Sequence, residues 1–115
     1  DIEELGEGAW VGLRIGDDSC FVTLCLRRTA AGPQLVVDRS ASRYTGRGAR
    51  RAVGVPAGAA GRLEVLHDRS ITEIFVGDGD LAFTLRSFVA PDSSGAALIA
   101  DGPVRLGPVA AVHFD

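Results

Sequence analysis

The 115-residue chain lacks several residue types, and each absence narrows its interpretation. It contains no Met, so we expect a piece of a longer protein or a processed product. All 12 basic residues are Arg and the net charge is −3, which argues against nucleic-acid binding because that function needs a dense basic surface. No apolar run is long enough to span a bilayer, and no secretory signal pattern opens the chain. We therefore expect neither nucleic acid nor membrane as a partner, and the sequence leaves open whether the parent is secreted.

Cysteine is scarce, and its spacing argues against a disulfide. Cys20 and Cys25 are five residues apart in one expected strand, which places them on opposite faces and about 16 Å apart. A disulfide needs Cα atoms about 4.4–6.8 Å apart, so we expect two free, packed thiols. His67 and His113 show no ligand spacing, and phosphate and dinucleotide motifs are absent. We expect structural histidines, no metal and no cofactor.

Short apolar runs broken by Gly, Asp and Pro predict an all-β fold. In the first two long runs, Val11, Leu13 and Ile15 alternate on one face, and Val22, Leu24 and Leu26 do the same. About nine strands in one domain predict a sandwich or a barrel, and periodicity does not separate the two. The expected strands are 9–15, 20–27, 35–39, 62–68, 71–76, 81–88, 96–100, 104–106 and 109–114.

Two segments have the composition of turns and one that of a long loop. "GDGD" (77–80) predicts a tight hairpin, and Asp68 and Ser70 are suited to closing the turn before residue 71. Residues 40–62 read as one long irregular stretch. This stretch is either a solvated loop or an arginine-rich contact with an acidic partner surface, because guanidinium groups suit carboxylates. The arginines concerned are Arg43, Arg47, Arg50 and Arg51.

Asp68 and Glu73 raise the possibility of a glycosidase pair. A retaining glycosidase needs two carboxyls about 5–5.5 Å apart across a sugar-sized cleft. Nothing near these two residues supplies the cleft or an aromatic platform for a sugar. We therefore predict a structural role, with Glu73 on the face of Ile71 and Phe75, partly buried and bonded to backbone or to an Arg. No catalytic residue is assigned.

Trp10 and Tyr44 are candidates for stacking on a sugar ring. The alternative for Trp10 is a core position, which is the more common place for a Trp in a strand of a small β domain.

The segment "LEVLHDRSITEIFVGDGDLAFTLRSF" resembles the C-terminal β-sandwich domain of glycoside hydrolase family 32, the family of invertases, levanases, inulinases and sucrose-6-phosphate hydrolases. "LVVDRSAS" (35–42) is similar to an earlier strand of that domain, and the resemblance extends over nearly the whole chain. The chain departs from the family pattern in "GDG", where Asn-Asp-Gly is usual, and in "FVAP", where an aromatic often directly precedes Pro. The matching residues are Asp68, Arg69, Ser70, Glu73, Phe75, Asp78 and Gly79.

The resemblance implies a two-sheet antiparallel β-sandwich, concanavalin- or lectin-like, over residues 1–115. It implies a parent β-fructosidase whose catalytic carboxylates lie in a preceding five-bladed propeller, whose signatures are absent here. The chain is then an inactive support domain that packs on that propeller, with sucrose or fructan as substrate of the parent and a homodimer as a further partner. The competing hypothesis is a stand-alone carbohydrate-binding, lectin-like module.

Overall fold

The computed structural model of the chain is all-β, with no helix among its described residues, which are 1–16, 19–42, 49–56, 58–68, 71–86 and 95–111. Every strand pairing in this part is antiparallel, so the predicted fold class is confirmed. The strands are β1 (Ile2–Leu5), β2 (Trp10–Gly16), β3 (Phe21–Thr29), β4 (Gly32–Asp38), β5 (Arg50–Gly54), β6 (Leu63–Asp68), β7 (Ile71–Val76), β8 (Leu81–Arg86), β9 (Ala96–Asp101) and β10 (Val104–Leu106).

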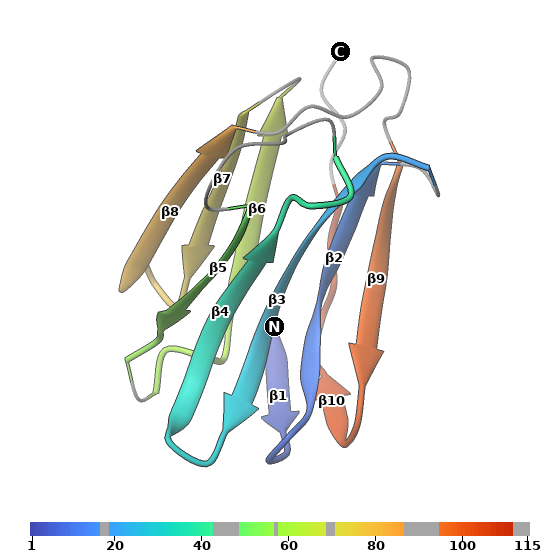
Figure 1. Cartoon of the computed structure of the whole chain (residues 1–115). Helices are drawn as coiled ribbons and strands as arrows, with labels where there is room; N and C mark the ends of the chain where they lie inside the picture. The colour runs from blue at the N-terminus through green and yellow to red at the C-terminus, as the bar shows by residue number, and fades with distance from the viewer. Residues whose placement is uncertain (17–18, 43–48, 57, 69–70, 87–94, 112–115) are drawn as a thin grey trace.

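The strands form two layers, and the five-stranded sheet makes one of them, with the order β5-β4-β3-β2-β9. The second layer holds the three-stranded sheet β6-β7-β8 and the two-stranded ribbon β1-β10 (Figure 1). The ribbon lies beside the three-stranded sheet, because the N–H of Ile2 donates to the carbonyl of Gly61, just before β6, at 2.8 Å.

The core lies between the layers and is built from the residues that alternate toward it. Val22, Leu24 and Leu26 of β3 are fully buried, as their period-2 spacing predicts, and they pack in one cluster with Ile74 and Val76 of β7. Partly buried side chains of β1, β6 and β8 pack against the same cluster. One core therefore joins both layers of the sandwich.

Two strands were missed by the sequence analysis. β1 carries two glutamates in four residues and has no clear apolar alternation, so its strand character depends on pairing with β10. β5 lies inside the stretch 40–62, for which we predicted irregular structure, and that prediction is wrong for residues 50–54. It is an edge strand paired with β4, where consecutive arginines are tolerated because one face meets water.

The predicted final strand, 109–114, is wrong over its first three residues, which have no regular structure, and residues 112–114 lie outside the described part. The β1-β10 pairing continues only to Gly107, whose N–H donates to Asp1, and to the carbonyl of Pro108, which accepts from the N-terminal amine.

Neither Cys20 nor Cys25 forms a disulfide, and both are partly buried. Burial raises the pKa of the Cys25 thiol, and the nearby Arg27 and Arg50 oppose this effect only in part. Cys25 therefore serves as a small packing residue on the outer side of β3.

Candidate functional site

The motif residues that the structure describes fall into two groups. Asp68, Glu73 and Phe75 belong to the face of β6-β7-β8 that points away from the core, while Asp78 and Gly79 form the connection between β7 and β8. Arg69 and Ser70 lie outside the described residues. The motif thus marks an outer sheet face and a hairpin.

The two carboxylates do not enclose a cleft. Asp68 stands opposite Ile71 and Glu73 stands opposite Leu66, so the acids occupy diagonal positions on one sheet face. Diagonal positions in an antiparallel pair are about 7–8 Å apart, and an open face offers no enclosure for a glycosidic bond. Glu73 is partly buried beside Phe75 and Ile71, as predicted, but its predicted bond to backbone or Arg is not found among the described residues.

The β7–β8 connection confirms the predicted hairpin. Gly77 and Gly79 have φ of 69° and 92°, the left-handed region that glycine adopts without strain. The Asp80 carboxylate accepts from the N–H of Asp78 at 3.1 Å, and the Gly77 N–H donates to the carbonyl of Arg62 at 2.9 Å. Asp78 also lies 3.8 Å from the Arg62 guanidinium, an exposed pair of little energetic weight. These motif residues therefore build a turn.

The earlier Asp-Arg-Ser step shows what such a sequence does at the end of a strand. The Asp38 carboxylate, at the end of β4, accepts from the Ser40 N–H at 2.9 Å and from its hydroxyl at 2.5 Å. The acid closes the turn that follows its strand, as Asp side chains commonly do. Asp68 ends β6 in the same way, and we expect the same role for it.

The arginines of the predicted contact do not share one surface. Arg50 and Arg51 are consecutive in β5 and point to opposite faces of the sheet, with Arg50 opposite Asp38 in register. The Arg51 guanidinium lies 5.8 Å from the centre of the Phe83 ring on β8, so it bridges the two layers at the open edge of the sandwich. Arg43 and Arg47 lie outside the described residues.

Trp10 is partly buried on the outer face of the five-stranded sheet and does not belong to the core cluster. It stands between Arg27 of β3 and Asp101 of β9 in register. Tyr44 lies outside the described residues. A sugar-stacking role for either residue stays a prediction.

His67 is part of a polar pair inside the sandwich. The sequence predicted only that this histidine is structural. Its Nδ1 lies 2.8 Å from the hydroxyl of Thr72, its cross-strand neighbour, and Thr72 is fully buried. Burial lowers the pKa of His67 from its usual 6.5, and the Asp68 carboxylate partly opposes this. The fold therefore favours the neutral imidazole.

A measurable pH dependence follows from the lowered pKa of His67. As the pH falls, His67 binds a proton in the unfolded chain before it does so in the folded chain. The contribution of His67 to the free energy of unfolding is therefore largest above pH 6.5 and falls as the pH drops toward the lower pKa of the folded state. His67→Gln keeps a hydrogen-bonding partner for Thr72 without this charge change. Between pH 7 and 5.5 the free energy of unfolding of this variant should fall less than that of wild type. The difference should be below about 1 kcal/mol, because His67 is only half-buried. Urea titrations at three pH values measure this, and parallel curves would refute it.

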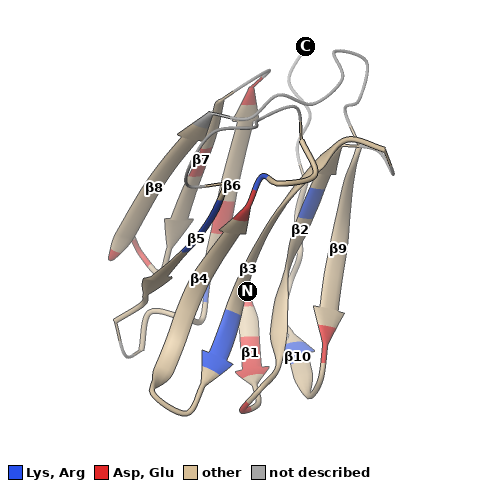
Figure 2. Ribbon diagram, in the orientation of Figure 1, with Lys and Arg blue, Asp and Glu red and all other residues tan. Residues whose placement is uncertain are grey.

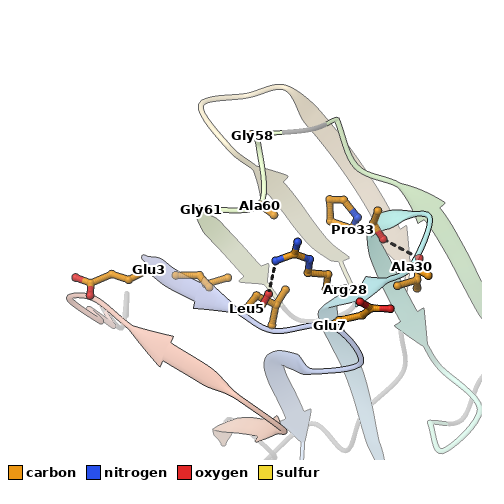
Figure 3. Close-up of a pocket in the computed structure, with 12 residues that line it drawn as sticks. Glu3, Leu5, Glu7, Arg28, Ala30, Pro33, Gly58, Ala60 and Gly61 are labelled. Carbon is orange, nitrogen blue, oxygen red and sulfur yellow. Dashed lines mark hydrogen bonds between the residues drawn. The ribbon is translucent and has the colours of Figure 1, made fainter.

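A shallow pocket opens at one end of the sandwich, where β1, the β3–β4 hairpin and residues 58–61 meet (Figure 3). Its volume is about 440 Å³, and Leu5, Pro33 and Ala60 line it together with Arg28. The Arg28 guanidinium donates to the Leu5 carbonyl at 3.1 Å, which fixes β1 against β3. Sequence reasoning missed this arginine, whose only signal was its place at the end of a strand.

The pocket does not bring two carboxylates together. Glu3 and Glu7 both line it, but they lie at opposite sides, and the Glu3 side chain points away from the pocket (Figure 3). Glu3 is paired with Arg105 at 3.2 Å. This geometry has no nucleophile facing an acid, so it does not support glycoside cleavage.

Other classes of site receive no support from the part of the chain that the structure describes. Across its described ranges no group of three His, Cys, Asp or Glu is placed to hold a metal ion. Those ranges also contain no helix with the length and apolarity to cross a membrane.

A two-layer sandwich whose motif acids stand on an open face and at strand ends, with no carboxylate pair across a cleft in its described part, offers no site for glycoside cleavage in that part. The family model described as "Glycosyl hydrolases family 32 C terminal" matches residues 12–113. The chain belongs to this family, and membership implies a glycoside hydrolase parent in which the domain is linked to a catalytic domain. No curated protein and no solved structure matches the chain.

Proposed function

We propose that residues 1–115 form the non-catalytic C-terminal domain of a β-fructosidase that hydrolyses sucrose or fructans, and that the domain packs on the catalytic propeller and stabilises it. The observation that carries the proposal is the position of Asp68 and Glu73. They are acids of the family motif, yet they stand on the outer face of an antiparallel sheet. Acids placed this way serve the architecture or a contact surface and leave bond cleavage to another domain.

The chemistry of glycoside hydrolysis supports this division of labour. The reaction needs a protonated acid beside the leaving oxygen and a second carboxylate across the sugar ring. Neither the Asp68–Glu73 face nor the pocket at Arg28 offers that pair. The catalytic carboxylates of the parent then belong to the domain that precedes this one.

The test compares the full-length parent with residues 1–115 expressed alone. We expect the parent to release fructose from sucrose or a fructan and the isolated domain to release none. In the parent, Asp68→Asn and Glu73→Gln should each leave kcat within about twofold of wild type, whereas loss of a catalytic group costs about 10⁴-fold or more. Hydrolysis by the isolated domain, or a collapse of kcat in either variant, would reject the proposal.

Three finer assignments remain predictions of the same scheme. They are a contact made by the arginines of residues 43–51, stacking of a sugar on Trp10 or Tyr44, and a homodimer of the parent. Trp10 fluorescence, titrated with millimolar sucrose or fructan, tests the stacking directly, because a bound sugar changes the environment of the ring.

A further inference from the structure

The central strand of the three-stranded sheet carries large apolar residues on both of its faces. Thr72, Ile74 and Val76 of β7 are fully buried against the core. Ile71, Glu73 and Phe75 alternate with them and point to the outer face, so two of the three outer residues are apolar. An antiparallel sheet that is solvated on one side normally has polar residues there, whereas apolar residues on both sides are typical of a sheet covered twice. The pattern indicates that something covers the outer face of β6-β7-β8.

The apolar residues of this outer face adjoin one another. Leu66 of β6 stands opposite Glu73, so Ile71 and Phe75 are its two diagonal neighbours on β7. Leu66 is 46% exposed and Ile71 is 43% exposed, and Phe75 is partly buried between them and Ala82. Large apolar side chains that are exposed side by side mark an interaction surface more often than scattered ones do.

Acidic side chains lie among and beside these apolar residues, with Glu73 opposite Leu66 and between Ile71 and Phe75. Glu64, Asp68 and Glu73 belong to the same face, and the first two are exposed at either end of β6 (Figure 2). The face is therefore acidic, and a partner that fits it carries an apolar patch flanked by Arg or Lys.

The area of the face indicates whether its partner is an independent protein or a domain of the same polypeptide. Three strands of six residues cover about 20 × 14 Å, on the order of 280 Å². A stable complex of independent proteins, such as a dimer of this chain, needs about 800 Å² on each side. Contacts between domains of one chain total about 600–1,500 Å², or roughly 300 Å² and more per side, because the linker holds the partners together. The face is far smaller than one side of a dimer interface and lies at the lower limit of contacts within one chain, so a domain of the same polypeptide fits it better than a free partner.

The position of β1 places a tethered domain near this face. The N–H of Ile2 bonds to Gly61, directly before β6, so β1 enters the layer that contains β6-β7-β8. β1 therefore belongs to the layer that carries this face, so a catalytic domain that is joined to β1 is joined to this layer.

We propose that the outer face of β6-β7-β8 is the surface on which the catalytic domain of the same polypeptide docks, with Leu66, Ile71 and Phe75 as its apolar centre and Glu64, Asp68 and Glu73 facing basic side chains of that domain. The inference rests on the proposed function, since it names the face through which the domain stabilises the catalytic propeller.

The experiment uses the full-length parent and three of its variants. Leu66→Arg/Ile71→Arg replaces the apolar centre by charges that repel a basic partner surface. Leu98→Arg/Val109→Arg is the matched control, because these residues are 52% and 65% exposed and do not belong to the face. Glu64→Arg/Asp68→Arg alters only exposed side chains and guards against misfolding of the first variant. The readouts are the unfolding midpoint of the catalytic domain, measured as residual hydrolysis after heating, and protease cleavage between the domains.

The face variants should lower that midpoint by about 4 °C or more and expose the interdomain segment to protease, while the control stays within about 1 °C of wild type. The shift of the Glu64→Arg/Asp68→Arg variant should shrink in high salt, because exposed charges are screened. Midpoints of both face variants equal to the control would overturn the inference. A second result would also overturn it. If the parent is a dimer, and the Leu66→Arg/Ile71→Arg variant is a monomer whose catalytic domain keeps the wild-type midpoint, the face binds a second copy.

Deleting residues 1–115 from the parent separates the inference from the proposed function. If deletion leaves the catalytic domain as stable as in the parent, the support role itself is wrong. If deletion lowers the midpoint but both face variants behave as the control does, the domain supports the enzyme through another surface, and only the docking face is wrong.

Discussion

Gly12→Ala should destabilise the domain by about 3 kcal/mol or more, because the added methyl group collides with backbone. Gly12 lies in β2 opposite Cys25 of β3. A Cβ at this position would overlap the carbonyl oxygen of Leu24 and lie 2.5 Å from the Cα of Cys25. Backbone atoms in the centre of a sheet cannot move aside as a flexible side chain can, so the two strands would have to separate.

Gly54→Ala is the matched control for this effect. Gly54 also lies in a strand, β5, and a Cβ there meets nothing within 4 Å. We expect a change within about 0.5 kcal/mol, with the lost flexibility of the unfolded chain acting in favour of the variant. Urea unfolding of residues 1–115 measures both, and equal midpoints for the two variants would show that β2 and β3 are not in this close contact.

Leu24→Ala is the second substitution with a large expected effect. Leu24 is 0% exposed and lies at the middle of β3, the central strand of the five-stranded sheet. Removing its buried methyl groups loses their transfer free energy and leaves a cavity, together about 2.7–5 kcal/mol. Domains of this size have a total stability of about 5–15 kcal/mol, so the variant should lose a large fraction of its stability and unfold at a clearly lower temperature than wild type.

The comparison for Leu24 is a leucine with the same side chain and little burial. Leu98→Ala removes a half-exposed side chain from β9 at the edge of the same sheet, and we expect a loss of about 1 kcal/mol or less. Differential scanning calorimetry of the two variants gives the ordering. A Leu98→Ala variant as unstable as Leu24→Ala would mean that the edge of the sandwich is buried as deeply as its centre.

Local pattern was sufficient wherever one face of a strand meets the core. The alternation in residues 20–27 predicted that Val22, Leu24 and Leu26 share one face of β3, and that in 71–76 predicted that Ile71, Glu73 and Phe75 share one face of β7, because a strand places successive side chains on opposite faces. The glycines of 77–80 predicted the hairpin for an equally local reason, the positive φ that the connection requires. These elements need no partner to be recognised.

The misses share the opposite cause, because their structure depends on pairing with another strand. β1 is a strand because it pairs with β10, about a hundred residues away, and β5 is one because it pairs with β4. Residues 109–111 have the composition of a strand, but no strand of the described part pairs with them. A pairing partner elsewhere in the chain leaves no periodic signal in a short polar segment.

The sequence by itself determined the all-β class and the resemblance to the family motif, because these depend on residue types and their local order. Only the tertiary structure decided that Asp68 and Glu73 share an open outer face, that Arg50 and Arg51 point apart, and that Leu66 adjoins Ile71 and Phe75. Each of these depends on the register between strands, and a shift of one residue in that register would move every side chain to the other face.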